Sequence, residues 1–315
     1  MSLLKHPYID ALTEIPCYPD FVPLDFTLKN ILHPRLSLTF DGVSEFTFAG
    51  LFLFRKRYNY RVSRTCKDGN FIISGEQPES NKHGKTFFMT PCASPEWEIL
   101  ESLFQTHDYW KNISESILAP VKEKLEEQGV VTEEDRDNFD YLYYRSDLAE
   151  LSGKKYHKKK NHVNNFLNSY CDYEQRPMSA ELIPAAIKIL ETWRQDMLAR
   201  NAKEDGDYNA SKEALELFDS LTLKGSIFFV GGEPAAWCLG ESIARGRMFA
   251  IHFEKAIDEY KGIYQFVNQS FAASLPRFFS LINREQDLGN EGLRQAKMTY
   301  RPCGYVKKYT GVLEK

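Results

Sequence analysis

The sequence predicts an α/β fold of the α+β type, with two tandem halves that each contain a mixed, largely antiparallel sheet flanked by helices. The clearest observation is a meander in the second half, where three runs of strand-forming residues are joined by tight turns. Helical and strand-like segments alternate after this meander, and the first half shows a similar, less regular order. The polar stretch Cys171–Ser179 contains Pro177 and separates the halves, so we expect domains at residues 1–170 and 171–315.

The elements of the second half follow from residue periodicity and turn signals. The meander strands are expected at Ser226–Val230, Ala235–Ile243 and Met248–Phe253. A helix, a strand, a helix and a final strand are expected at Tyr264–Leu275, Phe278–Ile282, Gly292–Tyr300 and Tyr305–Val312. Two helices are expected before the meander, at Ala180 to about Ala202 and at Ser211–Ser220.

The first half carries weaker signals of the same kinds. Its strands are expected at Tyr58–Val62, Asn70–Ser74, Lys85–Thr90 and Phe139–Tyr144. Its helices are expected at Phe46–Phe54, Asn112–Gln128 and Tyr156–Asn168. A further helix is expected to open at Pro95 with Ser94 as its N-cap.

Composition indicates a globular protein with no basic field over the whole molecule. Of the 315 residues 43% are hydrophobic and 27% are charged, and the formal net charge is −4. Residues 1–7 lack the apolar core of a secretion signal, and no apolar run is long enough to cross a bilayer. We therefore expect a cytoplasmic protein without a transmembrane segment, and the sequence leaves the oligomeric state open.

The six cysteines are scattered along the chain and form no CxxC pair. This spacing disfavours a zinc ribbon and a dense disulfide framework, so no metal site is expected. Free, mostly buried thiols in a reducing cytosol are the simplest interpretation.

A basic segment within residues 153–166 contains five lysines and two histidines in nine consecutive positions. Lys158, Lys159, Lys160 and His162 could neutralise phosphates of RNA, a lipid head group or a nucleotide. A solvated helix face is an equally good interpretation. Tyr156, Lys160, Val163 and Phe166 could share a face and give the helix a packed side, and the lysine cluster would then be displayed in a fixed direction.

Polar residues also crowd the end of a predicted strand, within residues 282–297. Ligands of open α/β sheets bind at the carboxyl ends of strands, and a following helix offers free N–H groups. Carboxylates and basic side chains there are candidates for a general base and for substrate binding. The candidate bases are Glu285 and Asp287, and the candidate substrate ligands are Asn283, Arg284, Arg294 and Lys297. The alternative is a buried ion-pair network at a strand–helix junction.

A third segment runs from the last meander strand into the next helix. His252 lies near the end of that strand and could act as a base, although a lone strand histidine is more often structural. Gln265 and Asn268 lie one helical turn apart and could orient a substrate amide. No P-loop, GxGxxG, HExxH or GxSxG motif occurs, which disfavours ATP, dinucleotide, zinc-protease and serine-hydrolase chemistry.

Three motifs resemble an uncharacterised bacterial family related to the C-terminal catalytic domain of phosphatidylglycerol lysyltransferases. They are FTFAGLFLFR at residues 46–55, YYRSDLA at 143–149 with the basic segment to 166, and NREQDLG at 283–289 running into GLRQAK at 292–297. The resemblance implies a tandem fold of two N-acetyltransferase (GNAT)-like domains. It also implies transfer of an aminoacyl group from charged tRNA to a lipid head group. The membrane-spanning part of those enzymes has no counterpart here, which leaves the acceptor open.

Three function hypotheses follow. The first is an acyl or aminoacyl transferase whose donor is an aminoacyl-tRNA or an acyl-CoA thioester and whose acceptor is an amine or a hydroxyl. The second is a non-catalytic module that binds RNA or an anionic ligand, such as a lipid, through the basic helix. The third, weaker one is a conventional acetyl-CoA transferase. Glu254, Asp258 and Glu259 follow the last meander strand with a single glycine and would repel a pyrophosphate.

Overall fold

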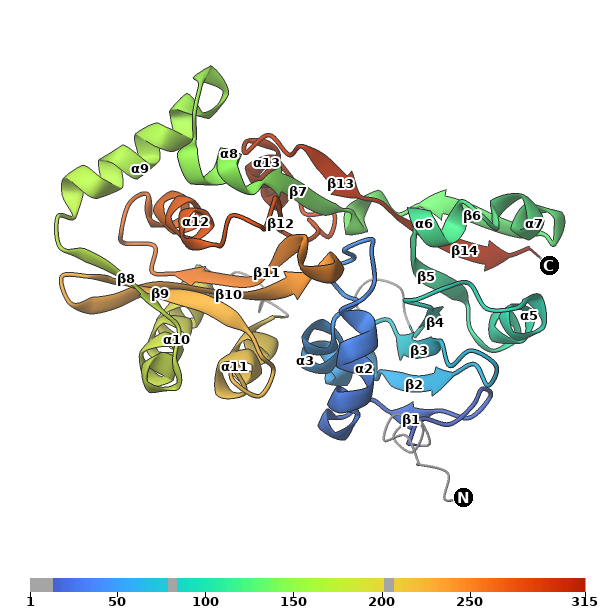
Figure 1. The fold of residues 1–315 in the computed structure, drawn as a ribbon. Coiled ribbons are helices and arrows are strands. Elements are labelled where there is room, and N and C mark those ends of the chain that lie inside the picture. The colour runs from blue at the N-terminus through green and yellow to red at the C-terminus, as the bar shows by residue number, and fades with distance from the viewer. Residues whose placement is uncertain (1–13, 79–83, 201–206, 315) are drawn as a thin grey trace, which may run out of the picture. The chain divides into compact units, whose positions relative to one another are not determined.

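The computed structural model describes residues 14–78, 84–200 and 207–314, and the chain divides into two compact units (Figure 1). Unit 1 comprises Met1–Phe139 and Val306–Lys315, and unit 2 comprises Asp140–Tyr305. This division corrects the expected boundary between residues 170 and 171. The reason is strand pairing. The strand that begins at residue 140 pairs within the sheet of unit 2, whereas the last strand of the chain pairs within the sheet of unit 1.

Unit 2 is built on a seven-stranded sheet with the order β13-β7-β12-β11-β10-β9-β8. The strands are β7 (Asp140–Tyr144), β8 (Tyr173–Pro177), β9 (Lys224–Val230), β10 (Glu233–Ile243), β11 (Met248–Ala256), β12 (Leu281–Asn283) and β13 (Gly304–Val306). The antiparallel meander β9–β11 is confirmed, and β12 runs parallel to β11. β12 begins at Leu281 rather than Phe278, because the Phe279 N–H turns back to the Pro276 carbonyl.

Helices cover both faces of this sheet (Figure 1). One face carries α8 (Arg145–Glu150), α9 (His157–Ser169) and α12 (Ile263–Ser274), and the other carries α10 (Ile183–Ala199) and α11 (Tyr208–Glu216). The core on the first face is rich in aromatic rings: Phe166 stacks on Phe266 at 4.4 Å, and Phe249 contacts Phe271 edge-on. The last helix, α13 (Glu291–Met298), follows β12.

Unit 1 has its own seven-stranded sheet, with the order β1-β2-β3-β4-β5-β14-β6. The strands are β1 (Val22–Pro23), β2 (Arg61–Arg64), β3 (Phe71–Glu76), β4 (Thr86–Met89), β5 (Tyr109–Ser114), β6 (Val130–Glu134) and β14 (Lys308–Leu313). The helices of more than one turn are α2 (Lys29–Leu36), α3 (Phe48–Tyr58), α5 (Trp97–Thr106) and α7 (Lys122–Glu127), and α6 (Glu115–Leu118) is a single turn. Helix α5 has Glu96 rather than Ser94 at its N-cap.

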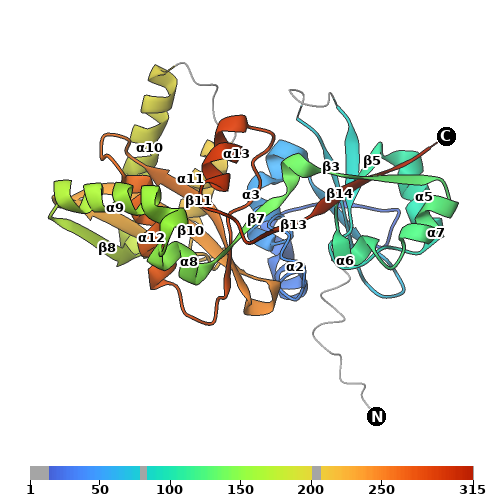
Figure 2. The same ribbon diagram turned by 90° about the horizontal axis from the view of Figure 1, so that it is seen from above.

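The two units repeat one plan. In each, an antiparallel three-strand meander is followed by a helix and by a strand parallel to the last meander strand: β2–β4, α5 and β5 in unit 1, and β9–β11, α12 and β12 in unit 2. The next neighbour of that parallel strand comes from elsewhere in the sequence, β14 beside β5 and β7 beside β12. Figure 2 shows β14, in red, running among the strands of unit 1. This repeat confirms the predicted tandem GNAT-like fold.

Four strands were not expected from the sequence: the two-residue β1 and the longer β5, β6 and β8. Residues 112–114 were assigned to a helix but belong to β5, where all six residues are buried. Strand β6 follows Gly129 within a run of acidic residues, and β8 is a polar edge strand with no buried residue. Polar and edge strands lack the apolar alternation that marks a strand.

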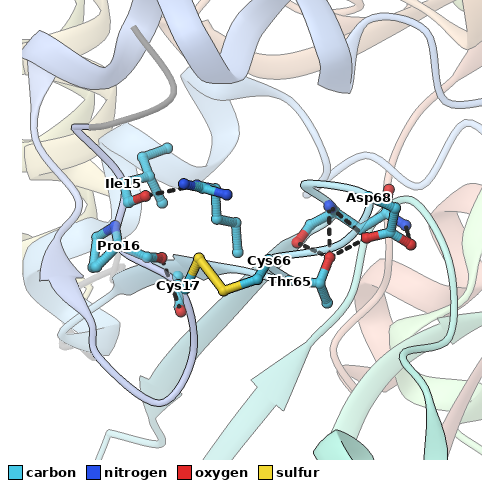
Figure 3. Close-up of a disulfide and its surroundings, with 9 residues drawn as sticks. Ile15, Pro16, Cys17, Thr65, Cys66 and Asp68 are labelled. Atoms are coloured by element: carbon cyan, nitrogen blue, oxygen red, sulfur yellow. Dashed lines mark hydrogen bonds between the residues drawn. A yellow bond between two sulfur atoms is a disulfide. The ribbon is translucent and has the colours of Figure 1, made fainter. Parts of the chain in front are cut away.

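A disulfide joins Cys17 to Cys66 in unit 1, which corrects the expectation that all six cysteines are free thiols (Figure 3). The pairing ties the segment before β1 to the end of β2, where the Arg64 side chain also donates to the Ile15 carbonyl. The other four cysteines are free. A sequence separation of 49 residues gave no hint of this pairing.

Within the described ranges, which begin at residue 14, we find no helix of the length and apolar character that crossing a membrane requires.

Candidate functional site

The candidate site begins where the parallel strands β11 and β12 separate. Their pairing ends at Ala250 and Asn283, although β11 continues to Ala256. The chain that leaves β12 forms the site turn, defined here as residues 284–290, before α13 begins. The turn contains two non-glycine residues with a left-handed backbone, Glu285 (φ 57°) and Leu288 (φ 53°). Such conformations are rare and need support from their surroundings.

A bulge in β11 lies opposite the site turn. The register between β10 and β11 shifts at Leu239/Gly240, which leaves His252 as the extra residue of the longer strand. A Cβ atom on Gly240 would lie 1.9 Å from the Ala250 carbonyl oxygen, so this close approach of two strands requires glycine. Bulges redirect side chains, and this one directs His252 towards the site turn.

His252 lies between two carboxylates. Its Nδ1 is 2.7 Å from Glu285 Oε1, and its Nε2 is 3.0 Å from Glu241 Oε1. Burial alone lowers the pKa of His252, but the two hydrogen-bonded carboxylates raise it to about 10. The ring is therefore an imidazolium at neutral pH and both nitrogens are engaged, so its ground state holds no lone pair for a substrate.

Arg284, the first residue of the site turn, lies between a carboxylate, Glu254, and an aromatic ring, Tyr300. Its Nη2 lies 3.5 Å from both Glu254 oxygens, and its guanidinium carbon lies 5.3 Å from the centre of the Tyr300 ring. Burial raises the pKa of Glu254 and that of Tyr300, the latter to about 12. The side chains of Arg284 and Glu285 keep 16% and 26% of their surface exposed, so the turn is accessible rather than sealed.

One lysine of the basic helix α9 also lies beside Tyr300. Lys159 Nζ lies 4.1 Å from the centre of the Tyr300 ring, and no ion pair or hydrogen bond holds it among the described residues. Burial and then the Arg284 charge lower the pKa of Lys159. Two cations thus converge beside one tyrosine. Lys158, Lys160 and His162 instead lie exposed, while Val163 and Phe166 form the packed side.

Asn283 and Lys297 are buried and bonded within the protein. The Asn283 amide donates to Asp140 Oδ2 at 3.1 Å and accepts the Glu285 N–H at 2.7 Å. Lys297 donates to three consecutive carbonyl oxygens of the site turn. Burial, followed by the Arg284 charge, lowers the pKa of Lys297 to about 8.

Asp287, which is fully buried, forms an ion pair with the partly exposed Arg294 at the end of the site turn. The Arg294 Nε and Nη2 donate to Asp287 at 2.9 and 2.8 Å, and the Tyr141 hydroxyl and the Gly289 N–H donate to the same carboxylate. Burial alone would raise the pKa of Asp287, but these donors hold it far below its usual range. The ion-pair interpretation of this segment therefore describes Asp287 with Arg294, and it also describes Arg284 with Glu254 and Glu285 with His252. Arg284 and Glu285 differ from Asp287 in that part of each side chain is exposed.

Asn268 is a buried amide whose oxygen and nitrogen have no partner among the described residues. One turn earlier on α12, Tyr264 donates to the β11 residue Ala256, and at the next turn Phe271 contacts Phe249 of β11. Residues spaced three and four apart share a helix face, so Asn268 faces the middle of β11. An unsatisfied buried amide costs about 1–3 kcal/mol and suits a polar ligand or water. Gln265 is half-buried on the same helix.

Glu241, Glu254 and Tyr300 complete the site and were not selected from the sequence as site residues. Glu254 lies two positions after His252 on the same strand, so the two side chains point to the same face of the sheet. This spacing was the sequence signal that could have identified Glu254. Tyr300 lies after α13, and Glu241 lies on a neighbouring strand. Only the folded sheet brings these three residues to the site turn.

The chain matches known proteins over most of its length. The family model described as phosphatidylglycerol lysyltransferase, C-terminal, matches residues 38–311, which confirms the predicted resemblance. A conserved protein of unknown function from Bacteroides thetaiotaomicron is 28% identical with a TM-score of 0.83, covering 93% of this chain and 99% of that one. A C-terminal domain from Agrobacterium fabrum, assigned to a lysylphosphatidylglycerol synthetase, has a TM-score of 0.59 at 13% identity and covers 92% of each chain.

A curated relative is more distant. It is an uncharacterized protein of Mycoplasmoides gallisepticum, 24% identical over 177 residues. The match spans 54% of this chain and 54% of that protein, so it reaches about half the length of the relative.

Proposed function

Because the chain belongs to the family of phosphatidylglycerol lysyltransferase C-terminal domains, we propose that it transfers an acyl or aminoacyl group to an amine or hydroxyl acceptor in unit 2. The observation that carries the proposal is the pair of cations, Arg284 and Lys159, beside Tyr300 at the accessible start of the site turn. Two positive charges held close together in a half-buried place favour an anionic ligand. Asn268 supports the proposal as a buried amide without a partner among the described residues.

An aminoacyl-tRNA is the proposed donor. Arg284 and Lys159 would hold the phosphate nearest the reacting ester, and Lys158, Lys160 and His162 would contact the polynucleotide from the outer side of α9. An acyl-CoA thioester is the alternative donor. The argument that the acidic residues Glu254, Asp258 and Glu259 repel a pyrophosphate is weaker than the sequence indicated. Arg200 pairs with Asp258, and Arg284 lies against Glu254.

The proposed chemistry is attack by the acceptor on the donor carbonyl. Glu285 engages His252 through Oε1 only, so its other oxygen can take the proton of the attacking amine or hydroxyl. The new amide or ester bond forms as the bond to the tRNA oxygen breaks, and that oxygen takes up the proton. The His252 imidazolium keeps the Glu285 carboxylate oriented. Orientation of the two substrates supplies much of the rate in such transfers.

Neighbouring lysines of α9 provide a test. Lys159→Met should lower transfer from charged tRNA about tenfold or more, the effect of losing one charge-assisted contact. Lys160→Met should change it less than threefold, because that side chain is exposed and its contact is screened. The measurement is product formation with charged tRNA or acyl-CoA as donor, and with amine, hydroxyl or anionic phospholipid acceptors. Equal effects of the two variants, or no transfer from any donor, would contradict the proposal.

A second candidate function is favoured by the exposed side of α9. A module that only binds RNA would use Lys158, Lys160 and His162 without chemistry. Replacing these three residues with Gln should then weaken tRNA binding and flatten its dependence on salt, measured by filter binding between low and physiological ionic strength. Under this alternative Glu285→Gln changes nothing, whereas under the transferase proposal it removes transfer and leaves tRNA affinity intact.

A further inference from the structure

The Lys297 ammonium is bonded to the backbone of the site turn through all three of its donors. Its Nζ lies 2.6 Å from the Arg284 oxygen, 3.0 Å from the Glu285 oxygen and 2.6 Å from the Gln286 oxygen. An ammonium group has three N–H donors, so none remains for a substrate. The residue is 9% exposed, and its own carbonyl accepts the Tyr143 hydroxyl at 2.8 Å, which fixes the end of α13.

The site turn needs such a partner. Its carbonyls at Arg284, Glu285 and Gln286 converge on one ammonium, and Glu285 has a left-handed backbone. Left-handed backbone is unfavourable for a non-glycine residue. Strand β7 reaches one of these carbonyls, because the Tyr141 N–H donates to Glu285. Other hydrogen bonds also hold the turn. The Asn283 side chain accepts the Glu285 N–H, and the Tyr141 carbonyl accepts the Arg284 N–H.

The geometry points to Lys297 as a positioning residue that holds the site-turn backbone in the conformation that presents the Arg284 guanidinium and the Glu285 carboxylate to the substrate. The effect on catalysis in this inference rests on the proposed function. The hydrogen bonds from Lys297 to the site turn are present without a substrate. It assigns Lys297 a role other than substrate binding. Since Lys297 lies on α13 and Arg284 follows β12, it also couples the helix to the site.

A second buried lysine of unit 2 serves as the matched control. Lys255 is 4% exposed, donates to both oxygens of Asp207 at 2.8 Å and lies 3.7 Å from the centre of the Trp193 ring. Lys297→Met and Lys255→Met each remove one buried ammonium and keep an unbranched side chain. Both variants should unfold more easily. Only Lys297→Met should speed amide hydrogen exchange in residues 284–290, by about tenfold or more.

The transfer assay supplies the second readout. Lys297→Met should lower kcat about tenfold or more, while Lys255→Met should stay within about threefold of the wild type and Lys297→Arg should recover part of the rate by keeping a charged donor. Unchanged exchange in the site turn of Lys297→Met overturns the inference. So does equal acceleration in both variants. Faster exchange limited to Lys297→Met, in a protein that transfers nothing from any donor, supports the inference and rejects the proposed function.

Discussion

Replacing His252 with leucine lowers the free energy of unfolding by roughly 3–5 kcal/mol at pH 7, the typical cost of removing one partner from a buried ion pair. The imidazolium separates Glu241 and Glu285, whose side chains are 6% and 26% exposed. Without it, two carboxylates face each other in a poorly solvated place, and one of them must take up a proton or move. Urea denaturation at pH 7, followed by the fluorescence of the unit 2 tryptophans, measures the change.

A second substitution separates charge from packing. The double variant His252→Leu/Glu241→Gln removes the like-charge contact and should recover most of the lost stability. A loss of less than about 1 kcal/mol in the single variant, or no recovery in the double variant, would show that His252 is not held as a cation between the two carboxylates.

The same cation makes stability depend on pH. The folded-state pKa of His252 is raised to about 10 from a usual 6.5, so its contribution is complete below pH 6.5 and is lost as pH rises towards 10. The slope is at most about 1.4 kcal/mol per pH unit. Lys297 acts in the opposite direction above about pH 8, because its pKa is lowered to about that value and the unfolded chain then binds more protons. The decline should therefore be clearest between pH 6.5 and 8, and it should be absent from the double variant.

Local patterns were sufficient to predict the repeated part of the fold. The meander β9–β11 could be recognised because Gly231-Gly232 and the segment 244–247 mark its turns, and α12 because its apolar residues recur at helical spacing. The placement of β7 and β14 could not be predicted, since each pairs with a strand far away in the sequence. The expected domain boundary was misplaced for this reason.

The site was predictable to the extent that its residues are neighbours in the sequence. The segment 283–297 was selected because polar residues follow a strand, and the structure brings Arg284 and Glu285 of that segment to His252 and Glu254. The partners that decide the charge state of His252 could not be found, because Glu241 lies on another strand. Similarly, no local signal distinguishes Lys159 from Lys158 and Lys160. The register of α9 against Tyr300 makes that distinction.

Replacing Asp287 with asparagine should lower the free energy of unfolding by roughly 2–3 kcal/mol, although the two side chains have nearly the same shape. Each Asp287 oxygen accepts two bonds: one from Tyr141 and from Arg294 Nε, the other from Gly289 and from Arg294 Nη2. In either orientation, the amide nitrogen of asparagine would face two donors and lose both bonds, and the ion pair between Asp287 and Arg294 would be lost. Urea denaturation at pH 7 measures the loss.

The exposed pair between Arg200 and Asp258 is the matched control, with side chains that are 59% and 39% exposed. Asp258→Asn should change stability by less than about 1 kcal/mol, because water screens a surface pair. Arg294→Leu already removes the ion pair with Asp287, so Asp287→Asn should cost less in that background than in the wild type. If Asp287 were instead the general base that its place in the sequence suggested, Asp287→Asn would abolish transfer and leave the unfolding curve where it is. If Asp287→Asn destabilises the protein, and if this loss depends strongly on whether Arg294 is present, Asp287 anchors the site turn structurally. The reason is that a buried carboxylate that accepts bonds with both oxygens cannot be replaced by an amide without losing some of them.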